Sequence, residues 1–349
     1  MIKAGILGAS GYTGADLVRL LLRHPGVQIT FLSGERKAGQ TMAQVFPNFY
    51  GADLPILQSV DGIDWAQMDL DVVFCALPHA TSQAIISLIW NTNPALKIID
   101  LSADFRLRDP EVYAAWYGGA HGAPELQPHA VYGLTEHYSD DIAKARLVAC
   151  PGCYPTAALL ALLPLLQGGM ISHDNIIIDA KSGVTGAGRS LKEQTLFCEV
   201  SEAVHPYGLG HHRHMPEIEQ ELSKAAGSDV TVSFTPHLVP MNRGELETIY
   251  VRCSEGETAT SLKEKLLSNY NESHFVEVLP GATAPATRMV RGSNQCVLNV
   301  FDDRRPGHAI IVAAIDNLVK GSSGQAVQNM NLMLRLEETS GLQQVALFP

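Results

Sequence analysis

The chain is poor in charged residues, and poorest in positive ones. Charged residues make up 17% of its 349 residues, and 36 acidic residues outnumber 25 basic ones, so the formal net charge is −11. A surface with so few cations does not attract nucleic-acid phosphates or an anionic membrane, and we exclude both as main partners. The acidity itself favours solubility.

Long apolar runs and sorting signals are also missing. The best candidate for a membrane span, residues 157–166, contains Pro164 and ends near a Gly-Gly pair, so it is too short to cross a bilayer. The apolar start of the chain breaks at once into glycines and is not a secretory signal. The six cysteines follow no framework spacing. We therefore expect free thiols and a cytoplasmic protein.

The sequence does contain enough hydrophobic residues for two folded domains. They make up 46% of a chain of 349 residues, which is longer than a single core usually supports. No linker, internal repeat or low-complexity segment separates the two parts. The change in pattern along the chain places the boundary near residue 150.

The start of the chain predicts a dinucleotide-binding unit. An apolar strand over residues 2–7 precedes a glycine-rich loop and a helix over residues 15–23. The glycines permit a tight turn, close approach of a pyrophosphate and close packing of helix on strand, although their GxxGxxG spacing is a weaker match than GxGxxG. The residues expected to hold the dinucleotide are Gly8, Ser10, Gly11, Tyr12, Thr13 and Gly14.

The end of the second predicted strand, residues 27–32, bears on the choice of cofactor. NAD sites place an acid near this point, whereas NADP sites place cationic or hydroxyl groups that bind the 2′-phosphate. Glu35 lies beyond the strand, and Ser33, Arg36 and Lys37 form a group suited to a phosphate. We therefore expect NADP(H); a charged surface loop is the alternative.

Two more strand ends supply candidate binding residues. Residues 71–76 and 97–100 predict buried parallel strands. The loops that follow such strands are where open α/β sheets bind ligands. This makes Pro78 a candidate cofactor contact and Arg106 a candidate clamp for an anionic substrate group. A salt bridge with Asp104 or Asp109 is the alternative for Arg106.

The segment PGCYPT, residues 151–156, is the most informative in the chain. Cys153 follows Pro-Gly and precedes a long apolar run that predicts a helix over residues 156–166. At a helix amino end, unpaired N–H groups and the helix dipole stabilise a thiolate. Because the thiolate is the nucleophilic form of cysteine, the sequence predicts covalent catalysis at Cys153.

Histidines crowd a later segment, at positions 205, 211, 212 and 214, and a fifth follows at 237. An imidazole near Cys153 could exchange protons with the thiol and with a substrate. Spacing alone leaves His212 and His214 as equal candidates. A zinc site built from these histidines and a cysteine is the alternative, but no CxxC with HxxxH and no HExxH helix occurs.

The rest of the chain predicts a second kind of sheet. Residues 175–179, 230–236, 247–253 and 295–302 predict strands of a mixed or antiparallel sheet, with a helix near 260–268, and this sheet offers a flat face for dimerisation. A loop rich in glycine and hydroxyl groups follows the first strand and could hold a substrate anion through Ser182, Gly183 and Arg189. A final helix is expected from Ile315 to about Leu336. The fold class is α/β, a Rossmann-type parallel sheet followed by an α+β catalytic domain.

Six segments together resemble the N-acetyl-γ-glutamyl-phosphate reductase family of arginine biosynthesis, which is related to aspartate-semialdehyde dehydrogenase. They are residues 8–14, 100–106, 151–156, 181–189, 211–218 and 316–329. The resemblance runs from end to end. It departs at Cys150, where the family often has Asn.

The resemblance implies a reaction and roles for several residues. Cys153 is the nucleophile, the acid–base imidazole is His212 or His214 with His212 favoured, and Asn317 reaches the nicotinamide amide of NADP. Residues 1–150 and a C-terminal helix in 315–349 bind the cofactor, and residues 151–314 form the catalytic and dimerisation domain. The expected assembly is a homodimer or homotetramer. The expected reaction reduces N-acetylglutamyl phosphate to its semialdehyde and releases phosphate through a cysteine thioester.

Four alternatives remain at this point. Cys150 and Cys153 form a CxxC that could be a redox pair, although no thioredoxin-like context surrounds it. The substrate could be another acyl phosphate, such as aspartyl phosphate or a carrier-linked aminoadipyl phosphate. The chain could also be a zinc-dependent NADP oxidoreductase, or a nucleotide sensor that retains the fold without catalysis.

Overall fold

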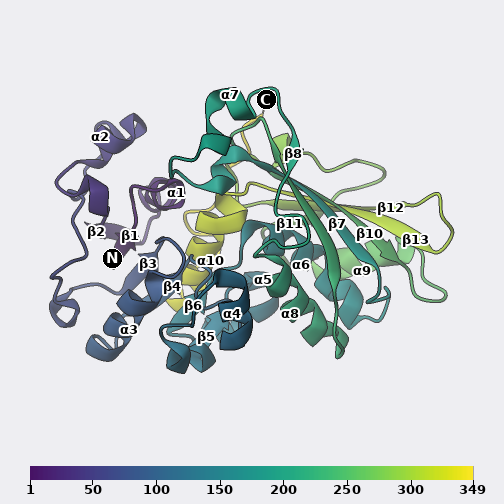
Figure 1. The fold of residues 1–349 in the computed structure, drawn as a ribbon, viewed down its shortest axis with the longest axis horizontal. Helices are drawn as coiled ribbons and strands as arrows, with labels where there is room; N and C mark the ends of the chain where they lie inside the picture. The colour runs from purple at the N-terminus through teal and green to yellow at the C-terminus, as the bar shows by residue number, and fades with distance from the viewer. Residues whose placement is uncertain (349) are drawn as a thin grey trace. The chain divides into compact units, whose positions relative to one another are not determined.

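The structure, a computed structural model, describes residues 1–348 and divides into two compact units. Unit 1 consists of Met1–Pro151 and Ser322–Gln343, and unit 2 consists of Gly152–Gly321 and the chain end from Gln344. Among the described residues, no helix is long and apolar enough to cross a membrane. Figure 1 shows the order of the elements along the chain.

Unit 1 is built on a six-stranded sheet in which every neighbouring pair is parallel. In spatial order the strands are β2 (Val27–Leu32), β1 (Ile2–Leu7), β3 (Val72–Cys75), β4 (Lys97–Asp100), β6 (Leu147–Ala149) and β5 (Ala130–Tyr132). Its α-helices are α1 (Tyr12–Leu21), α2 (Met42–Val45), α3 (Ser82–Thr92), α4 (Pro110–Tyr117), α5 (Thr135–Ile142) and α10 (Gly324–Met333). Helix α10 packs on α1, α5 and β4, so the end of the chain completes this unit.

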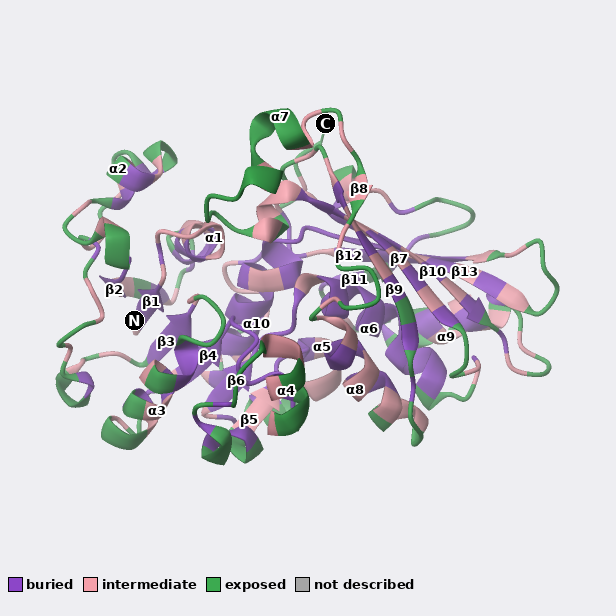
Figure 2. Cartoon of the chain, viewed as in Figure 1, coloured by how far each residue is buried: buried purple, intermediate pink, exposed green. Residues whose placement is uncertain are grey.

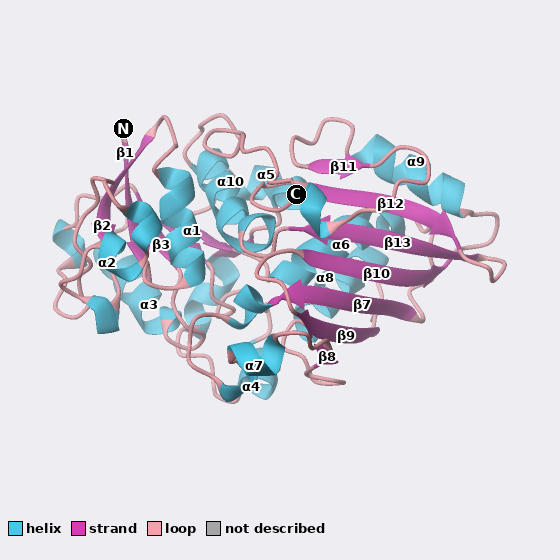
Figure 3. Cartoon of the chain, turned by 90° about the horizontal axis from the view of Figure 1, so that it is seen from above, coloured by secondary structure: helices cyan, strands magenta, loops and turns pink. Residues whose placement is uncertain are grey.

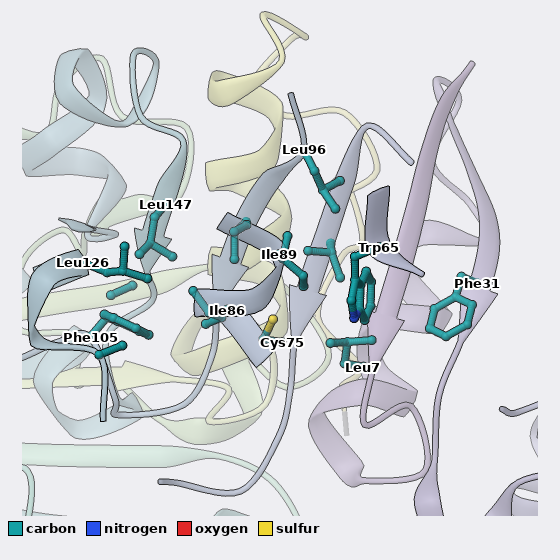
Figure 4. Packing of buried hydrophobic residues seen from close by; sticks show 14 residues of the cluster. Leu7, Phe31, Trp65, Cys75, Ile86, Ile89, Leu96, Phe105, Leu126 and Leu147 are labelled. Atoms are coloured by element: carbon teal, nitrogen blue, oxygen red, sulfur yellow. The ribbon is translucent and has the colours of Figure 1, made fainter. Parts of the chain in front are cut away.

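The core of unit 1 lies between its sheet and the surrounding helices. Figure 4 shows Leu7, Cys75 and Ile86 among the side chains of this cluster, with Phe31 and Trp65 toward the β2 edge. The rings of Phe31 and Trp65 meet edge to face, with centroids 6.2 Å apart. Figure 2 shows that the central strands are buried along their length, as is typical of parallel sheets covered on both faces.

Unit 2 contains a seven-stranded mixed sheet. In spatial order the strands are β11 (Val276–Val278), β12 (Cys296–Asp302), β13 (His308–Ile315), β10 (Glu245–Arg252), β7 (Ile176–Gly183), β9 (Val232–Val239) and β8 (His205–Pro206). The pairs β11–β12 and β7–β9 are parallel and the others are antiparallel. The helices are α6 (Cys153–Gln167), α7 (Phe197–Val200), α8 (Met215–Ala226) and α9 (Ala259–Asn269).

Helices α6, α8 and α9 cover one face of this sheet, and Figure 3 shows them behind the strands. Helix α6 is apolar on all sides and buried from Tyr154 to Leu166, because the sheet and the other two helices surround it. The opposite face carries half-buried residues such as Leu246, Thr248 and Tyr250 on β10. This face is mixed, since Leu246 packs in a small apolar cluster with Met289 while Lys181 pairs with Asp179 on the neighbouring strand.

The predicted fold class is confirmed, and two predicted elements need correction. The final helix does not start at Ile315, since Ile315 ends strand β13 and the chain continues through a π-helical turn (Val319–Ser323) into α10. The run HAIIVAAI is continuously apolar, so periodicity could not identify it as a strand. Helix α6 begins at Cys153 itself rather than at Thr156.

The contact between α1 and β1 depends on two glycines. Gly8 has φ +79°, and a Cβ there would lie 2.2 Å from the Ala76 carbonyl oxygen. A Cβ at Gly14 would lie 2.3 Å from the Gly8 carbonyl oxygen. Both positions therefore exclude any side chain, which is how the helix comes close to the strand.

We expect Gly14→Ala to lower the free energy of unfolding by about 1–3 kcal/mol, the usual cost of forcing a methyl group into a packed site. Gly11→Ala is the control, because a Cβ there meets one neighbour at 3.4 Å and its φ of −84° suits alanine. Chemical denaturation of the two variants and the wild type measures the difference. Equal stability of both variants would contradict the packing role of Gly14.

Candidate functional site

The glycine loop of unit 1 fits a dinucleotide. Gly11 is the residue before α1, and no side chain caps the amino end of this helix. The first N–H groups of the helix thus remain available to a phosphate, and the open space at Gly11 permits its approach. Ser10 packs beside Gly34, Tyr12 begins the helix, and the Thr13 hydroxyl lies 3.4 Å from that of Ser322.

The residues predicted to bind the 2′-phosphate, at the end of β2, have two different surroundings. Ser33 is buried, and its hydroxyl accepts a hydrogen bond from the Gly8 N–H at 3.1 Å, so it supports the glycine loop. Glu35 accepts hydrogen bonds from the Ser59 hydroxyl at 2.7 Å and the Val60 N–H at 2.9 Å. Arg36 is exposed and Lys37 is half-buried beside it. This leaves two cations, and an acid already engaged elsewhere, at the end of the strand.

The loop after β3 contains Pro78 and an unusual backbone conformation. Ala80 has φ +67°, in the left-handed region that side chains other than glycine rarely adopt. Its N–H donates to Asp104 Oδ1 at 2.7 Å, and the Tyr113 hydroxyl donates to the same oxygen at 2.8 Å. A buried carboxylate of the loop after β4 therefore fixes the loop after β3.

Arg106 is buried and binds backbone carbonyl groups, and its predicted role as a substrate clamp stays a prediction. Its Nε donates to the Cys150 carbonyl at 2.7 Å and its Nη2 to the Leu101 carbonyl at 3.0 Å. These bonds join the loop after β4 to the residue that follows β6. Two of the N–H groups that we expected to bind an anion thus bind the backbone.

Unit 2 places Cys153 at the first residue of α6, partly accessible to solvent. No side chain caps this helix end, so the helix dipole acts on the sulfur. The Glu217 carboxylate, on the first turn of α8, accepts a hydrogen bond from the Gly152 N–H at 2.8 Å. This bond fixes the turn that presents the cysteine.

Aromatic rings surround His212 in the same unit. Its ring centroid lies 5.7 Å from that of Tyr154, 5.4 Å from Tyr207, 5.3 Å from Phe234 and 4.9 Å from His214. Burial among these rings, followed by the charge of Arg213, lowers the pKa of His212 to about 4. The imidazole is therefore neutral at physiological pH.

One hydrogen bond fixes the tautomer of His212. The His214 N–H donates to His212 Nδ1 at 3.2 Å, so the single proton of the neutral ring lies on Nε2. His212 thus presents an N–H donor at Nε2, and its predicted acid–base role stays a prediction. Both rings pack on Tyr154, with His214 at 5.8 Å between centroids, but His212 also packs on Tyr207 and Phe234.

Tyr154 and Tyr207 form the wall beside these rings. Their hydroxyl groups lie 3.0 Å apart, and burial raises the pKa of both phenols. Both side chains are neutral at physiological pH. The structure places them with His212, a grouping that the sequence did not predict.

The predicted substrate loop follows β7. Ser182 is buried and donates to the Gly183 carbonyl at 3.3 Å, and Gly183 packs against the backbone of Asn242, whose carbonyl oxygen would lie 2.7 Å from a Cβ there. Arg189 lies in the exposed part of the loop. Of the three predicted residues, Arg189 is the most accessible to a ligand.

Asn317 lies outside the final helix, between β13 and the π-helical turn. Its Oδ1 accepts from the Gly244 N–H at 2.9 Å and its Nδ2 donates to the Thr185 hydroxyl at 3.0 Å. The side chain is 3% exposed. Its amide therefore joins the loops after β7 and before β10, and the predicted contact with nicotinamide stays a prediction.

Cys150 is buried, whereas Cys153 is partly accessible to solvent. It is 1% exposed, and burial raises the pKa of its thiol to about 12. The Asn329 amide of α10 donates to its sulfur at 3.5 Å. A thiol in this state is a core group and a poor partner for thiol–disulfide exchange.

Across residues 1–348, no group of three or more His, Cys, Asp or Glu side chains is arranged to hold a metal ion. No sequence motif points to two buried acids of unit 2: Glu217, which accepts a hydrogen bond from the Gly152 N–H, and Glu245, which lies near Cys153. The signal for Glu245 was present, because alternation along β10 gives it the same face as the core residues Ile249 and Val251.

Solved structures show the same fold. Aspartate semialdehyde dehydrogenase II from Vibrio cholerae, complexed with ASA, is similar with a TM-score of 0.73 and 18% identity, over 96% of this chain and 98% of that one. Aspartate semialdehyde dehydrogenase with NADP from Candida albicans is similar with a TM-score of 0.64 and 18% identity, over 96% and 99%. At this identity the likeness concerns the fold alone.

Comparison with sequence families and relatives identifies the family more closely than the fold does. Residues 3–145 match the semialdehyde dehydrogenase NAD binding domain, and residues 153–317 match the semialdehyde dehydrogenase dimerisation domain. N-acetyl-gamma-glutamyl-phosphate reductase of Afipia carboxidovorans is 61% identical over 345 residues, 99% of this chain and 98% of the relative. The enzyme of the same name from Rhodospirillum rubrum is 57% identical over 350 residues, 100% and 99%. The chain therefore belongs to the semialdehyde dehydrogenase family, among its N-acetyl-gamma-glutamyl-phosphate reductases, and is an oxidoreductase.

Proposed function

We propose that this chain reduces N-acetyl-γ-glutamyl phosphate with NADPH, through a thioester on Cys153, and releases N-acetylglutamate semialdehyde and phosphate. The observation that carries this proposal is a cysteine at an uncapped helix end, with a neutral imidazole and two neutral phenols in the same unit. The names of the full-length relatives supply the substrate.

The first step is attack of the Cys153 thiolate on the acyl carbon. The sulfur forms a bond to carbon, and the bond from that carbon to the phosphate oxygen breaks. The dipole of α6 stabilises the attacking thiolate and, after collapse of the second tetrahedral state, the departing one. Arg189 is our candidate for holding an anionic group of the substrate.

His212 acts in this scheme as a neutral hydrogen-bond donor. Its Nε2–H stabilises the oxyanion that develops on the acyl oxygen in each tetrahedral state. Its low pKa makes it a poor acceptor for the thiol proton, because a conjugate acid of pKa about 4 returns a proton readily to a thiolate. We therefore assign it to charge stabilisation.

The nicotinamide cofactor supplies a hydride to the thioester carbonyl when it is bound. Residues Gly8–Gly14 would hold its pyrophosphate, and Arg36 and Lys37 would hold a 2′-phosphate. The engagement of Glu35 by Ser59 and Val60 supports NADP over NAD, since this acid is not directed at a ribose.

The active form in this proposal is a homodimer or homotetramer. Residues 153–317 match a dimerisation domain, and one face of the unit 2 sheet carries half-buried residues such as Thr248 and Tyr250. A second copy on this face would bury them.

Cys153→Ala should abolish turnover and leave binding of NADPH unchanged, because the variant removes the nucleophile and no part of the glycine loop. Phosphate-dependent reduction of NADP⁺ with the semialdehyde measures turnover in the reverse direction, and fluorescence titration measures binding. Cys198→Ala, at an exposed cysteine, is the control and should keep wild-type turnover. Substantial turnover by Cys153→Ala would refute the covalent mechanism.

His212→Asn should lower kcat about 10²–10³-fold, the usual effect of losing one oxyanion donor. Because the pKa of His212 is lowered to about 4, the imidazole stays neutral from pH 5 upward, and the wild-type profile of kcat/KM should show no acid limb near pH 6.5. The exposed neighbour His211→Asn is the control. An acid limb near pH 6.5 that disappears in His212→Asn would show general acid–base catalysis by this imidazole instead.

Replacing both Arg36 and Lys37 with alanine should raise the KM for NADPH roughly 10- to 100-fold, as expected for lost hydrogen bonds to a charged group, and should leave the KM for NADH unchanged. Arg23→Ala, at an exposed arginine that follows α1, is the matched control. Steady-state kinetics with the two cofactors decides the point. An equal effect on both cofactors would indicate that these cations do not read the 2′-phosphate.

A further inference from the structure

Strand β10 carries two carboxyl groups on the covered face of the unit 2 sheet that the mechanism above does not use. Glu245 and Glu247 are both 0% exposed. Glu245 is the first residue of this central strand and lies opposite Ser182 on β7 and Ile315 on β13. A carboxylate in such a place is costly unless a cation or several N–H groups compensate for its lost hydration.

Glu245 has no such compensation. Within residues 1–348, neither of its carboxyl oxygens accepts a hydrogen bond from an N–H group or from a hydroxyl group. The Cys153 thiol lies close enough to this carboxyl to lower its pKa, against the larger effect of burial. The nucleophile and the buried acid are therefore neighbours.

The packing around Cys153 holds the two groups together. A Cβ at Gly321 would lie 2.7 Å from the Cys153 Cβ and 3.2 Å from Ile315 Cδ1, so the backbone of the π-helical turn closes tightly over both residues. Ile315 is the direct neighbour of Glu245 across the sheet. Strand β10 also contacts α6, whose first residue is Cys153.

The charges that face Glu245 keep it in its acid form. Burial and the carboxylate of Asp316 raise its pKa to about 8, and burial raises the pKa of Glu247 well above its ordinary value. The charge of Lys181 acts on Glu247, and Arg243 pairs with Asp316 at 3.5 Å. Tyr154 and Tyr207, which also face Glu245, are neutral.

We propose that Glu245 is a neutral carboxylic acid that donates its hydroxyl hydrogen bond to the Cys153 thiolate and so stabilises the nucleophile. This rests on the proposed function, in which Cys153 is the nucleophile. The carboxyl proton stays on its oxygen throughout, so the role requires no transfer of a proton, electron or group. An ionised carboxylate at this place would oppose the thiolate by charge repulsion.

The proposal predicts different outcomes for two variants of similar volume. Glu245→Gln keeps an N–H donor, so alkylation of Cys153 by iodoacetamide at neutral pH should stay within about threefold of wild type. Glu245→Met keeps the volume and removes the donor, so the rate should fall roughly 10- to 100-fold, the range for a hydrogen bond to a charged group. Mass spectrometry of the Cys153 peptide measures the rate and separates it from alkylation of the exposed Cys198.

Glu247→Gln is the matched control, because Glu247 is as buried as Glu245 and lies two residues along the same face. It should alkylate at the wild-type rate. Wild type should also show a second inflection near pH 8, where Glu245 ionises and its donor is lost, and this inflection should be absent from Glu245→Gln. Thermal unfolding of each variant shows whether it is folded.

Three results would overturn the proposal: wild-type alkylation in a folded Glu245→Met, an equal loss in Glu245→Gln and Glu245→Met, or the same loss in Glu247→Gln. The second would mean that an ionised carboxylate acts as a base. If Glu245→Met does not fold, the comparison of the pH profiles of Glu245→Gln and wild type decides. Alkylation requires no acyl phosphate, so its result is independent of whether the proposed reaction occurs.

Discussion

The chemistry of this chain depends on one structural constraint: a helix buried on all sides must present its first residue to a polar site. Helix α6 is apolar from Tyr154 to Leu166 and packs on the sheet, α8 and α9. Its amino end is uncapped, and the bond from the Gly152 N–H to Glu217 fixes the turn before it. Cys153 thus has a fixed position in the field of a helix dipole that little water screens.

The groups around this position share a second property, which is the absence of ionic charge. Burial lowers the pKa of His212 and raises those of Tyr154, Tyr207 and Glu245, so each is neutral near pH 7. A neutral imidazole and a neutral acid can both donate hydrogen bonds to an anion. These neutral groups are therefore suited to donate hydrogen bonds to a single negative charge, first on sulfur and then on oxygen.

The sequence predicted those parts of the structure that depend on local pattern. Strands β1, β2, β3 and β4, the glycine loop and the place of Cys153 all follow from short-range periodicity and from glycine chemistry. It failed at β13, where a continuous apolar run carries no period. It could not show that Arg106 donates to the Cys150 carbonyl or that the Asn317 amide joins two loops, and the ligand roles of both residues stay predictions.

The two site residues that the sequence did not predict, Glu217 and Glu245, reach the cysteine turn through contacts between elements far apart in the chain. Glu217 and Glu245 lie 64 and 92 residues beyond Cys153 in the sequence. Their contacts with the cysteine turn arise because α8 and β10 both pack against α6. Neither residue stands in a motif that signals its partner. Only the three-dimensional arrangement distinguishes these buried acids from the other acidic residues of the chain.

The central claim is that the substrate becomes bonded to the sulfur of Cys153, and trapping the acyl-enzyme tests it most directly. The enzyme is mixed with N-acetyl-γ-glutamyl phosphate in the absence of NADPH, quenched in acid and digested, and the peptides are weighed by mass spectrometry. The account predicts an N-acetylglutamyl adduct on the Cys153 peptide with release of one phosphate per enzyme. Phosphate release without an adduct, or an adduct on any other residue, would contradict it.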